Sequence, residues 1–143
     1  MAGQPNFPGW LVFDVTDLTV GDNTVRGGDN IDITVNFTGS GGIWAFLEWL
    51  SDNIGPNPGV IGATAQFYAE GMGIGAGEYD LGSVVTPLAV AAAGSYSASI
   101  TVNTGAAPTN LAEGVYRIQC LVQVGNSGIM GFPDKDLLLS VYV

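Results

Sequence analysis

The segment from Asn30 to Phe37 alternates polar and apolar residues without interruption. Successive side chains of a β-strand point to opposite faces, so the segment predicts a strand with one buried face and one face in water. Such strands are typical of antiparallel sheets packed on a single core, because the strands of parallel sheets are buried on both faces. The predicted core positions are Ile31, Ile33, Val35 and Phe37.

The same alternation recurs along the chain. Segments with strand character are separated by turns rich in Gly, Pro and Asn, and they predict a β-sandwich of about seven or eight short strands. No repeat or linker divides the 143 residues, so we expect a single domain over residues 1–143. In one of the last strands, residues 114–124, the predicted core positions are Tyr116, Ile118, Cys120 and Val122.

The segment from Ile43 to Leu50 is compatible with two structures. Its apolar residues recur at helical spacing, whereas a strand would place Trp44, Phe46 and Glu48 on one face. The polar residues that follow, Ser51 to Asn53, are typical of a helix end. We therefore predict a short helical insert near residues 43–51.

The sequence contains no histidine and a single cysteine, Cys120. The chain therefore lacks the commonest general base, any Ser-His-Asp or Cys-His arrangement, and the imidazole ligands of zinc and copper. One cysteine forms no intrachain disulfide and no CxxC redox pair. The apolar neighbours of Cys120 predict an inert buried thiol. These features lead us to expect neither enzyme activity nor a cofactor.

Thirteen Asp and Glu residues oppose three basic residues, for a formal net charge of −10. Nucleic acids and anionic membranes are bound by clusters of Lys and Arg, so we expect neither as a partner. The segment Met1–Trp10 has no basic residue and no apolar run, and it does not resemble a signal peptide. No stretch is apolar enough to span a membrane, so we expect a soluble protein made in the cytoplasm.

Two parts of the chain share features with a known family. After the first strand come Val25-Arg-Gly-Gly-Asp29 and the alternating strand Ile31–Phe37, and near the end Leu111-Ala-Glu-Gly-Val-Tyr116 leads into another strand. These features, over roughly residues 10–38 and 94–143, resemble bacterial immunoglobulin-like domains, including the cell-adhesion-related modules.

The resemblance implies a fold but transfers no functional residue. It implies a tyrosine corner at Tyr116, with Cys120 four residues later instead of the two residues seen in antibody domains. The insert of residues 43–60 departs from the family pattern. The predicted fold class is therefore an all-β, immunoglobulin-like antiparallel β-sandwich of seven or eight strands with a short helical insert near residues 43–51.

Acidic residues form two groups of interest, one near the first turns and one beside the glycine-rich segment Gly71–Gly77. That segment does not read GxGxxG, so we interpret it as a loop that joins two strands. The carboxylates are candidates for a calcium site or for the acid–base pair of a hydrolase, although no EF-hand spacing is present and turn formation is an alternative role. The candidate ion-binding residues are Asp22, Asp29, Glu70, Glu78 and Asp80.

Two apolar groups lie outside the clear strands, one in the insert and one near the last hairpin. Large aromatic residues are enriched at protein interfaces, although they also close the open ends of sandwiches. We interpret both groups as a contact surface. The candidate interface residues are Trp44, Phe46, Trp49, Ile129, Met130 and Phe132.

Three functions follow, in order of preference. The first is a non-catalytic assembly subunit, such as a decoration or coat-type protein of a phage particle or bacterial filament, whose protein partners are copies of itself or an assembly scaffold. The second is a binding or adhesion module, with calcium assistance as a variant. The third is a hydrolase that uses the acidic residues near the glycine-rich loop.

Overall fold

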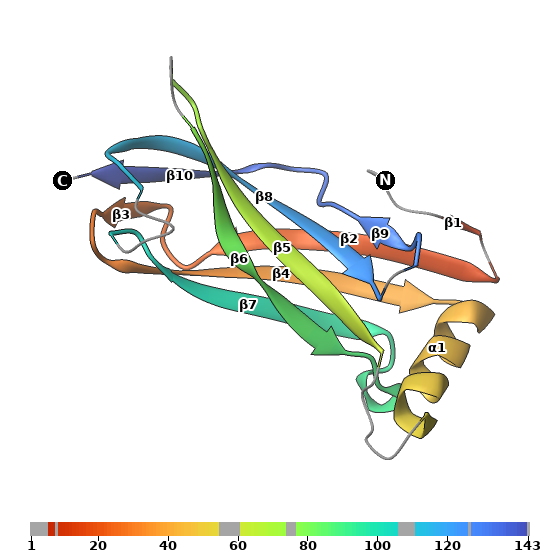
Figure 1. Cartoon of the computed structure of the whole chain (residues 1–143). Coiled ribbons are helices and arrows are strands. Elements are labelled where there is room, and N and C mark those ends of the chain that lie inside the picture. Colours follow the sequence, from red (N-terminus) through yellow and green to blue (C-terminus); the bar gives the residue numbers. More distant parts are fainter. Residues whose placement is uncertain are drawn as a thin grey trace.

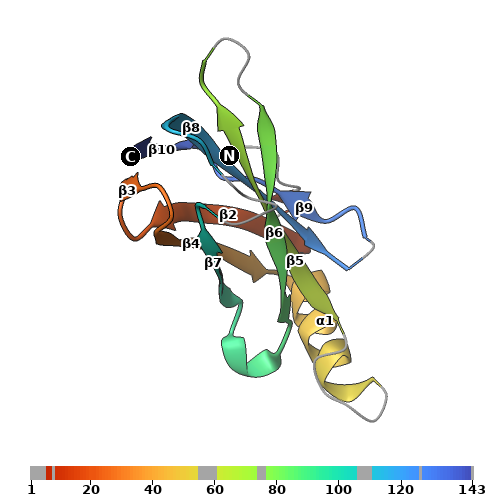
Figure 2. The same ribbon diagram turned by 60° about the vertical axis from the view of Figure 1, so that its left-hand side comes forward.

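The computed structural model describes residues 6–7, 9–54, 61–73, 77–105, 111–125 and 127–142. These residues form two β-sheets packed face to face, with one helix at an end of the sandwich (Figures 1 and 2). The first sheet has the strand order β1-β2-β4-β7. Its strands are β1 (Asn6–Phe7), β2 (Leu11–Val20), β4 (Asn30–Ser40) and β7 (Ser95–Asn103).

The second sheet has the order β3-β10-β8-β5-β6, and a short strand, β9, pairs with β8. A helix, α1 (Gly42–Asn53), follows β4, and a short 3₁₀ turn, η1 (Val90–Ala92), precedes β7. The strands of this sheet are β3 (Thr24–Arg26), β5 (Gly62–Gly71), β6 (Glu78–Pro87), β8 (Gly114–Val124), β9 (Met130–Gly131) and β10 (Leu137–Tyr142).

The alternating strands form the core as predicted. Ile31, Ile33, Val35 and Phe37 of β4 are buried, and they face buried residues of β8, which are Tyr116, Ile118, Cys120 and Val122. The opposite face of β4 is polar and forms a ladder with β7, in which Thr34 and Ser99 share a hydrogen bond of 2.7 Å. The prediction of which residues face the core is therefore confirmed for both strands.

The strand order is that of an immunoglobulin-like sandwich. In chain order β2, β4 and β7 correspond to strands A, B and E of that fold, and β5, β8 and β10 correspond to C, F and G. The Tyr116 hydroxyl at the start of β8 donates to the carbonyl of Ala112 at 2.6 Å, which is the tyrosine-corner contact. The predicted fold class is confirmed by these features.

Two details of the prediction were wrong. The described part of the chain contains ten strands instead of seven or eight, because β1, β3 and β9 span only two or three residues and are too short to show alternation. The sandwich is also not antiparallel throughout, since β3 pairs in parallel with β10. The reason is that the chain crosses from one sheet to the other between Val20 and Thr24.

The predicted helical insert is confirmed as α1, which extends from Gly42 to Asn53. In Figures 1 and 2 the helix lies at one end of the sandwich, and the hairpin of β5 and β6 projects at the other. That hairpin is closed by the glycine-rich segment, where the N–H of Gly71 donates to the Gly77 carbonyl at 2.9 Å. The segment joins two strands as predicted, although its residues 74–76 lie outside the described part.

Replacing Phe37 with Ala should lower the free energy of unfolding by about 3–5 kcal/mol, because the ring is fully buried and its loss leaves a cavity. Denaturant unfolding monitored by circular dichroism measures the change. Phe132→Ala is a matched control, since this phenylalanine is about half exposed and should cost much less. A loss below about 0.5 kcal/mol for Phe37→Ala would contradict the register of β4.

Candidate functional site

The helix α1 is held on the sandwich by Trp44, which is 1% exposed. Its indole stacks on Phe13 with ring centroids 5.6 Å apart and makes a T-shaped contact with the Tyr96 ring, with centroids 6.0 Å apart. The ring occupies space beside Gly39, where an added Cβ would lie 2.1 Å from the indole. The prediction that Trp44 is an interface residue was therefore wrong, because the missing side chain of Gly39 gives the indole a place in the core.

Two polar residues accompany Trp44 on the buried face of α1. The Glu48 carboxylate accepts hydrogen bonds from the Tyr96 hydroxyl at 2.5 Å and from the N–H of Gly94 at 3.1 Å. The Ser51 hydroxyl bonds with both the carbonyl and the N–H of Ile61, each at 3.1 Å. Both groups are thus satisfied by the fold, as most buried polar groups are. Residue spacing alone did not reveal this role, although positions 44, 48 and 51 share one helical face.

The opposite face of α1 is exposed and apolar. Phe46 is 55% exposed and Trp49 is 53% exposed, and their rings stack with centroids 6.3 Å apart. Ile43 lies one turn earlier, and its N–H donates to the carbonyl of Trp10, so that Trp10 adjoins the first turn. An ordinary surface helix buries its apolar side and exposes its charged side, whereas α1 buries Glu48 beside Trp44 and exposes two aromatic rings.

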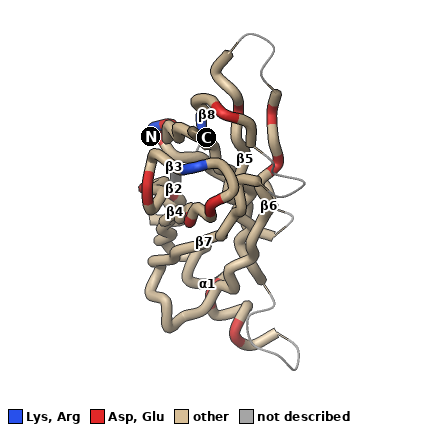
Figure 3. The backbone as a smooth tube through the Cα atoms, turned by 90° about the vertical axis from the view of Figure 1, so that its left-hand side faces the viewer, with Lys and Arg blue, Asp and Glu red and all other residues tan. Residues whose placement is uncertain are grey.

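The outward face of α1, defined here by Gly42, Ile43, Ala45, Phe46 and Trp49, carries no charge. Both charged residues of the helix are engaged elsewhere, since Glu48 is buried and the Asp52 carboxylate accepts the N–H of Val90 at 3.0 Å. Figure 3 shows that acidic residues are otherwise spread over the strands and loops of the sandwich. The outward face is therefore an uncharged region on a strongly acidic molecule.

The second predicted apolar group lies elsewhere. Met130 belongs to β9 and is exposed, Phe132 follows it and is 46% exposed, and Ile129 is partly buried against the core. Phe132 lines a groove of about 350 Å³ on the six-stranded sheet together with Tyr68 and other residues, none of which belongs to α1. The structure does not join the two apolar groups into one site.

The candidate ion-binding residues have local roles in the fold. Asp22 accepts the N–H of Thr24 at 3.1 Å, and Asp80 accepts hydrogen bonds from Gln66 and from the N–H of Gly82, both at 2.8 Å. Such contacts are typical of turns and bulges.

The other three candidates do not complete a site. The N–H of Asp29 closes a turn onto the carbonyl of Arg26 at 3.0 Å. Glu70 lies 3.9 Å from Arg117 and is opposite Glu78 in the ladder of β5 and β6. Within the described ranges, no three Asp, Glu, Cys or His side chains are grouped so that they could hold a metal ion.

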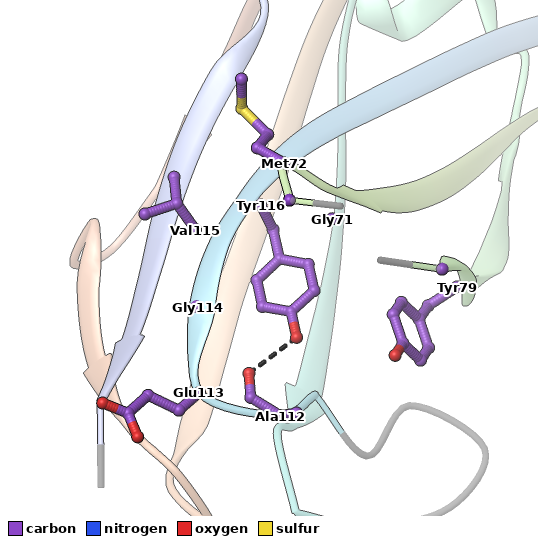
Figure 4. A pocket seen from close by; sticks show the side chains of 10 residues that line it. Gly71, Met72, Tyr79, Ala112, Glu113, Gly114, Val115 and Tyr116 are labelled. Carbon is purple, nitrogen blue, oxygen red and sulfur yellow. Dashed lines mark hydrogen bonds between the residues drawn. The ribbon is translucent and has the colours of Figure 1, made fainter. Parts of the chain in front are cut away.

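A cavity of about 480 Å³ lies beside the glycine-rich loop. The third predicted function was a hydrolase that uses the acidic residues near this loop. Figure 4 shows the rings of Tyr79 and Tyr116 beside it, with the hydroxyl of Tyr116 engaged by the carbonyl of Ala112. Glu113 is the one carboxylate among the described residues that line the cavity, and its side chain points away from both rings. The described lining thus offers no carboxylate pair for acid–base catalysis.

Cys120 is buried in the core, and burial raises the pKa of its thiol to about 12. The thiol is therefore protonated at neutral pH, in agreement with the inert role that was predicted. None of the helices that the structure describes is long and apolar enough to cross a membrane.

No protein-family model matches the sequence, and no curated protein matches it either. Among solved structures, the CARDB domain of PF1109 from Pyrococcus furiosus, in complex with di-metal ions, shares 14% identity at a TM-score of 0.49, covering 95% of this chain and 97% of that domain. A β-glucosidase from Listeria innocua shares 12% identity at a TM-score of 0.48 over 93% of this chain, which spans only 16% of the length of that enzyme.

A third similar structure is the alkylpurine DNA glycosylase AlkC from Pseudomonas fluorescens, with 8% identity and a TM-score of 0.48. The match covers 92% of this chain and 30% of that enzyme. At such low identities none of these similarities extends to function. The fold assignment depends on the strand order and the tyrosine corner of this chain.

The Glu48–Tyr96 contact predicts a dependence of stability on pH. Burial, together with the hydrogen bond to Glu48, raises the pKa of Tyr96 well above the usual 10. The unfolded chain therefore releases this proton near pH 10 while the folded chain retains it, so the free energy of unfolding should fall as the pH rises above about 10. Denaturant unfolding between pH 8 and 11.5 measures the slope.

Tyr96→Phe should show a shallower fall, whereas Tyr142→Phe, at an exposed tyrosine, should follow the wild type. An unchanged slope in Tyr96→Phe would show that this hydroxyl does not carry the pH dependence.

Proposed function

We propose that this chain is a non-catalytic immunoglobulin-like module that binds another protein through the outward face of α1. The observation that carries the proposal is the distribution of side chains on the helix, which places a carboxylate inside beside Trp44 and two stacked aromatic rings outside. The stability of the sandwich gives no reason for this arrangement, since Phe46 and Trp49 are half exposed and contribute little to the core.

The outward face has the properties of a protein-binding surface. Aromatic residues supply large contact areas and are the commonest centres of interface binding energy. The helix that carries them is held by the stacking of Trp44 and by the two hydrogen bonds to Glu48, so little conformational freedom would be lost on binding.

A protein suits this surface better than a membrane or a nucleic acid. Helices that lie on membranes combine their apolar face with Lys and Arg, and α1 carries neither. The net charge of −10 also opposes contact with phosphate-rich partners. An uncharged aromatic face needs no basic residues to bind a second protein, because burial against the apolar surface of that protein supplies the binding energy.

This proposal covers what the assembly and adhesion interpretations share, which is protein binding without catalysis. A place in a phage particle or a bacterial filament remains a prediction from the sequence. The calcium-assisted variant gains no support from the described carboxylates, because each candidate is engaged locally or lacks the companions that a calcium site needs.

Site-specific photo-crosslinking in the producing cells tests the proposal. A benzophenone side chain in place of Phe46 should yield a protein adduct, because this ring lies at the centre of the outward face. The same group in place of Ser97, exposed on the polar face of β7, is the control and should yield none. An absence of adducts from position 46, or equal adducts from both positions, would overturn the proposal.

The double variant Phe46→Ser/Trp49→Ser separates binding from folding. Exposed residues contribute little to stability, so the free energy of unfolding should change by no more than about 1 kcal/mol in total. A much larger loss would mean that the two rings serve the fold, which would remove the reason for assigning them to a partner.

A further inference from the structure

We infer that the protein bound at α1 is a second copy of this chain, docked by antiparallel pairing of the two α1 helices around a two-fold axis. This inference rests on the proposed function and names its partner. A two-fold interface is self-complementary, so the residue that one copy presents must fit the residue that it meets on the other.

The outward face meets this condition. Positions 42, 45, 46 and 49 follow the spacing of a helix–helix contact seam. With the axis between Ala45 and Phe46, antiparallel pairing places Trp49 of one copy opposite Gly42 of the other and Phe46 opposite Ala45. Each large ring therefore meets a position with no side chain or only a methyl group. The contact surface of one copy is thus complementary to the same surface of the other copy.

The two glycines at the start of α1 differ in a way that supports this pairing. Gly41 has a φ of +94°, and a Cβ there would lie 2.5 Å from the carbonyl oxygen of Trp10, so the fold of the chain itself requires glycine. At Gly42 the nearest atom to an added Cβ is the Gly9 carbonyl oxygen at 3.9 Å, an ordinary contact distance. Gly42 is therefore not required by its own chain, and a ring from a second copy gives it a role.

Charge also favours the outward face as the place where two copies meet. Each copy carries a net charge of −10, so most surfaces of the sandwich would repel their counterparts. The outward face has no charge, and Asp52 is held at η1 by its bond to Val90. Because the remaining repulsion acts over a distance that salt shortens to about 8–10 Å at physiological ionic strength, added salt should strengthen the pairing.

The available area predicts a weak dimer. Phe46 and Trp49 are about half exposed, and Trp10 at the first turn is 70% exposed. With Ile43 these side chains offer roughly 400 Å² per copy, since a buried aromatic side chain covers about 150–250 Å². The pair would bury roughly 800 Å², below the roughly 1,000 Å² that stable specific interfaces usually exceed, so we expect a transient dimer with a dissociation constant on the order of 100 µM.

Analytical ultracentrifugation of the purified full chain tests the inference over about 1–200 µM protein at two salt concentrations. The wild type should form dimers that tighten as salt is raised. Gly42→Leu should weaken dimerisation at least tenfold without lowering the thermal midpoint, because its side chain enters the space needed by the partner's Trp49. Gly21→Leu is the matched control, at a glycine with nothing within 4 Å of an added Cβ, and it should dimerise like the wild type.

The outcomes separate this inference from the proposed function. A wild type that stays monomeric under all these conditions, or a crosslinked adduct at position 46 whose mass is not twice that of the chain, would overturn the second copy as partner and leave protein binding intact. A folded Gly42→Leu variant that dimerises as tightly as the wild type would overturn the antiparallel pairing. The absence of any adduct would instead overturn the proposed function.

Discussion

The position of Trp44 against Gly39 determines how α1 lies on the sandwich. Where β4 ends, Gly39 leaves space that the indole fills between Phe13 and Tyr96. Gly94 allows a second close approach, since a Cβ there would lie 2.3 Å from the Gly39 carbonyl oxygen. Once Trp44 is buried, the 100° rotation per residue of an α-helix turns Glu48 inward as well and leaves Phe46 and Trp49 outside.

This arrangement buries a carboxylate on α1 and exposes two aromatic rings, and the contacts of Glu48 explain how the buried carboxylate is tolerated. A buried carboxylate is costly unless its oxygens are hydrogen-bonded, and Glu48 receives bonds from Tyr96 and from the backbone of Gly94. The indole N–H of Trp44 has no acceptor among the described residues, which costs about 1–3 kcal/mol. Apolar burial of the large ring offsets this cost. The outer rings are left free to contact another protein.

The sequence predicted the long strands well because alternation reports directly on burial. The strand Ile31–Phe37 was predicted from its alternation, and the tyrosine corner at Tyr116 was implied by the resemblance of residues 111–116 to immunoglobulin-like domains. The parallel pairing of β3 with β10 could not be predicted in this way, because it depends on where the chain crosses between sheets. Three residues give too little alternation to place β3.

The candidate surface was only partly predictable. Phe46 and Trp49 were identified from their residue type, but the same reasoning assigned Trp44 to the surface. Composition cannot distinguish an inward from an outward tryptophan until the rotation of the helix is known, and that rotation depends on Gly39, which lies on another element. The inward role of Glu48 was missed for the same reason, since its partner Tyr96 is 48 residues away in the chain.

The orientation of α1 is the central claim, and tryptophan fluorescence tests it most directly. In a Trp10→Phe/Trp49→Phe variant, Trp44 is the only tryptophan. The structure predicts an emission maximum shifted to the blue and strong protection from acrylamide quenching, both lost on unfolding. Emission at the wavelength of a solvated indole, with quenching as efficient as in the unfolded chain, would show that Trp44 faces solvent and would contradict the account.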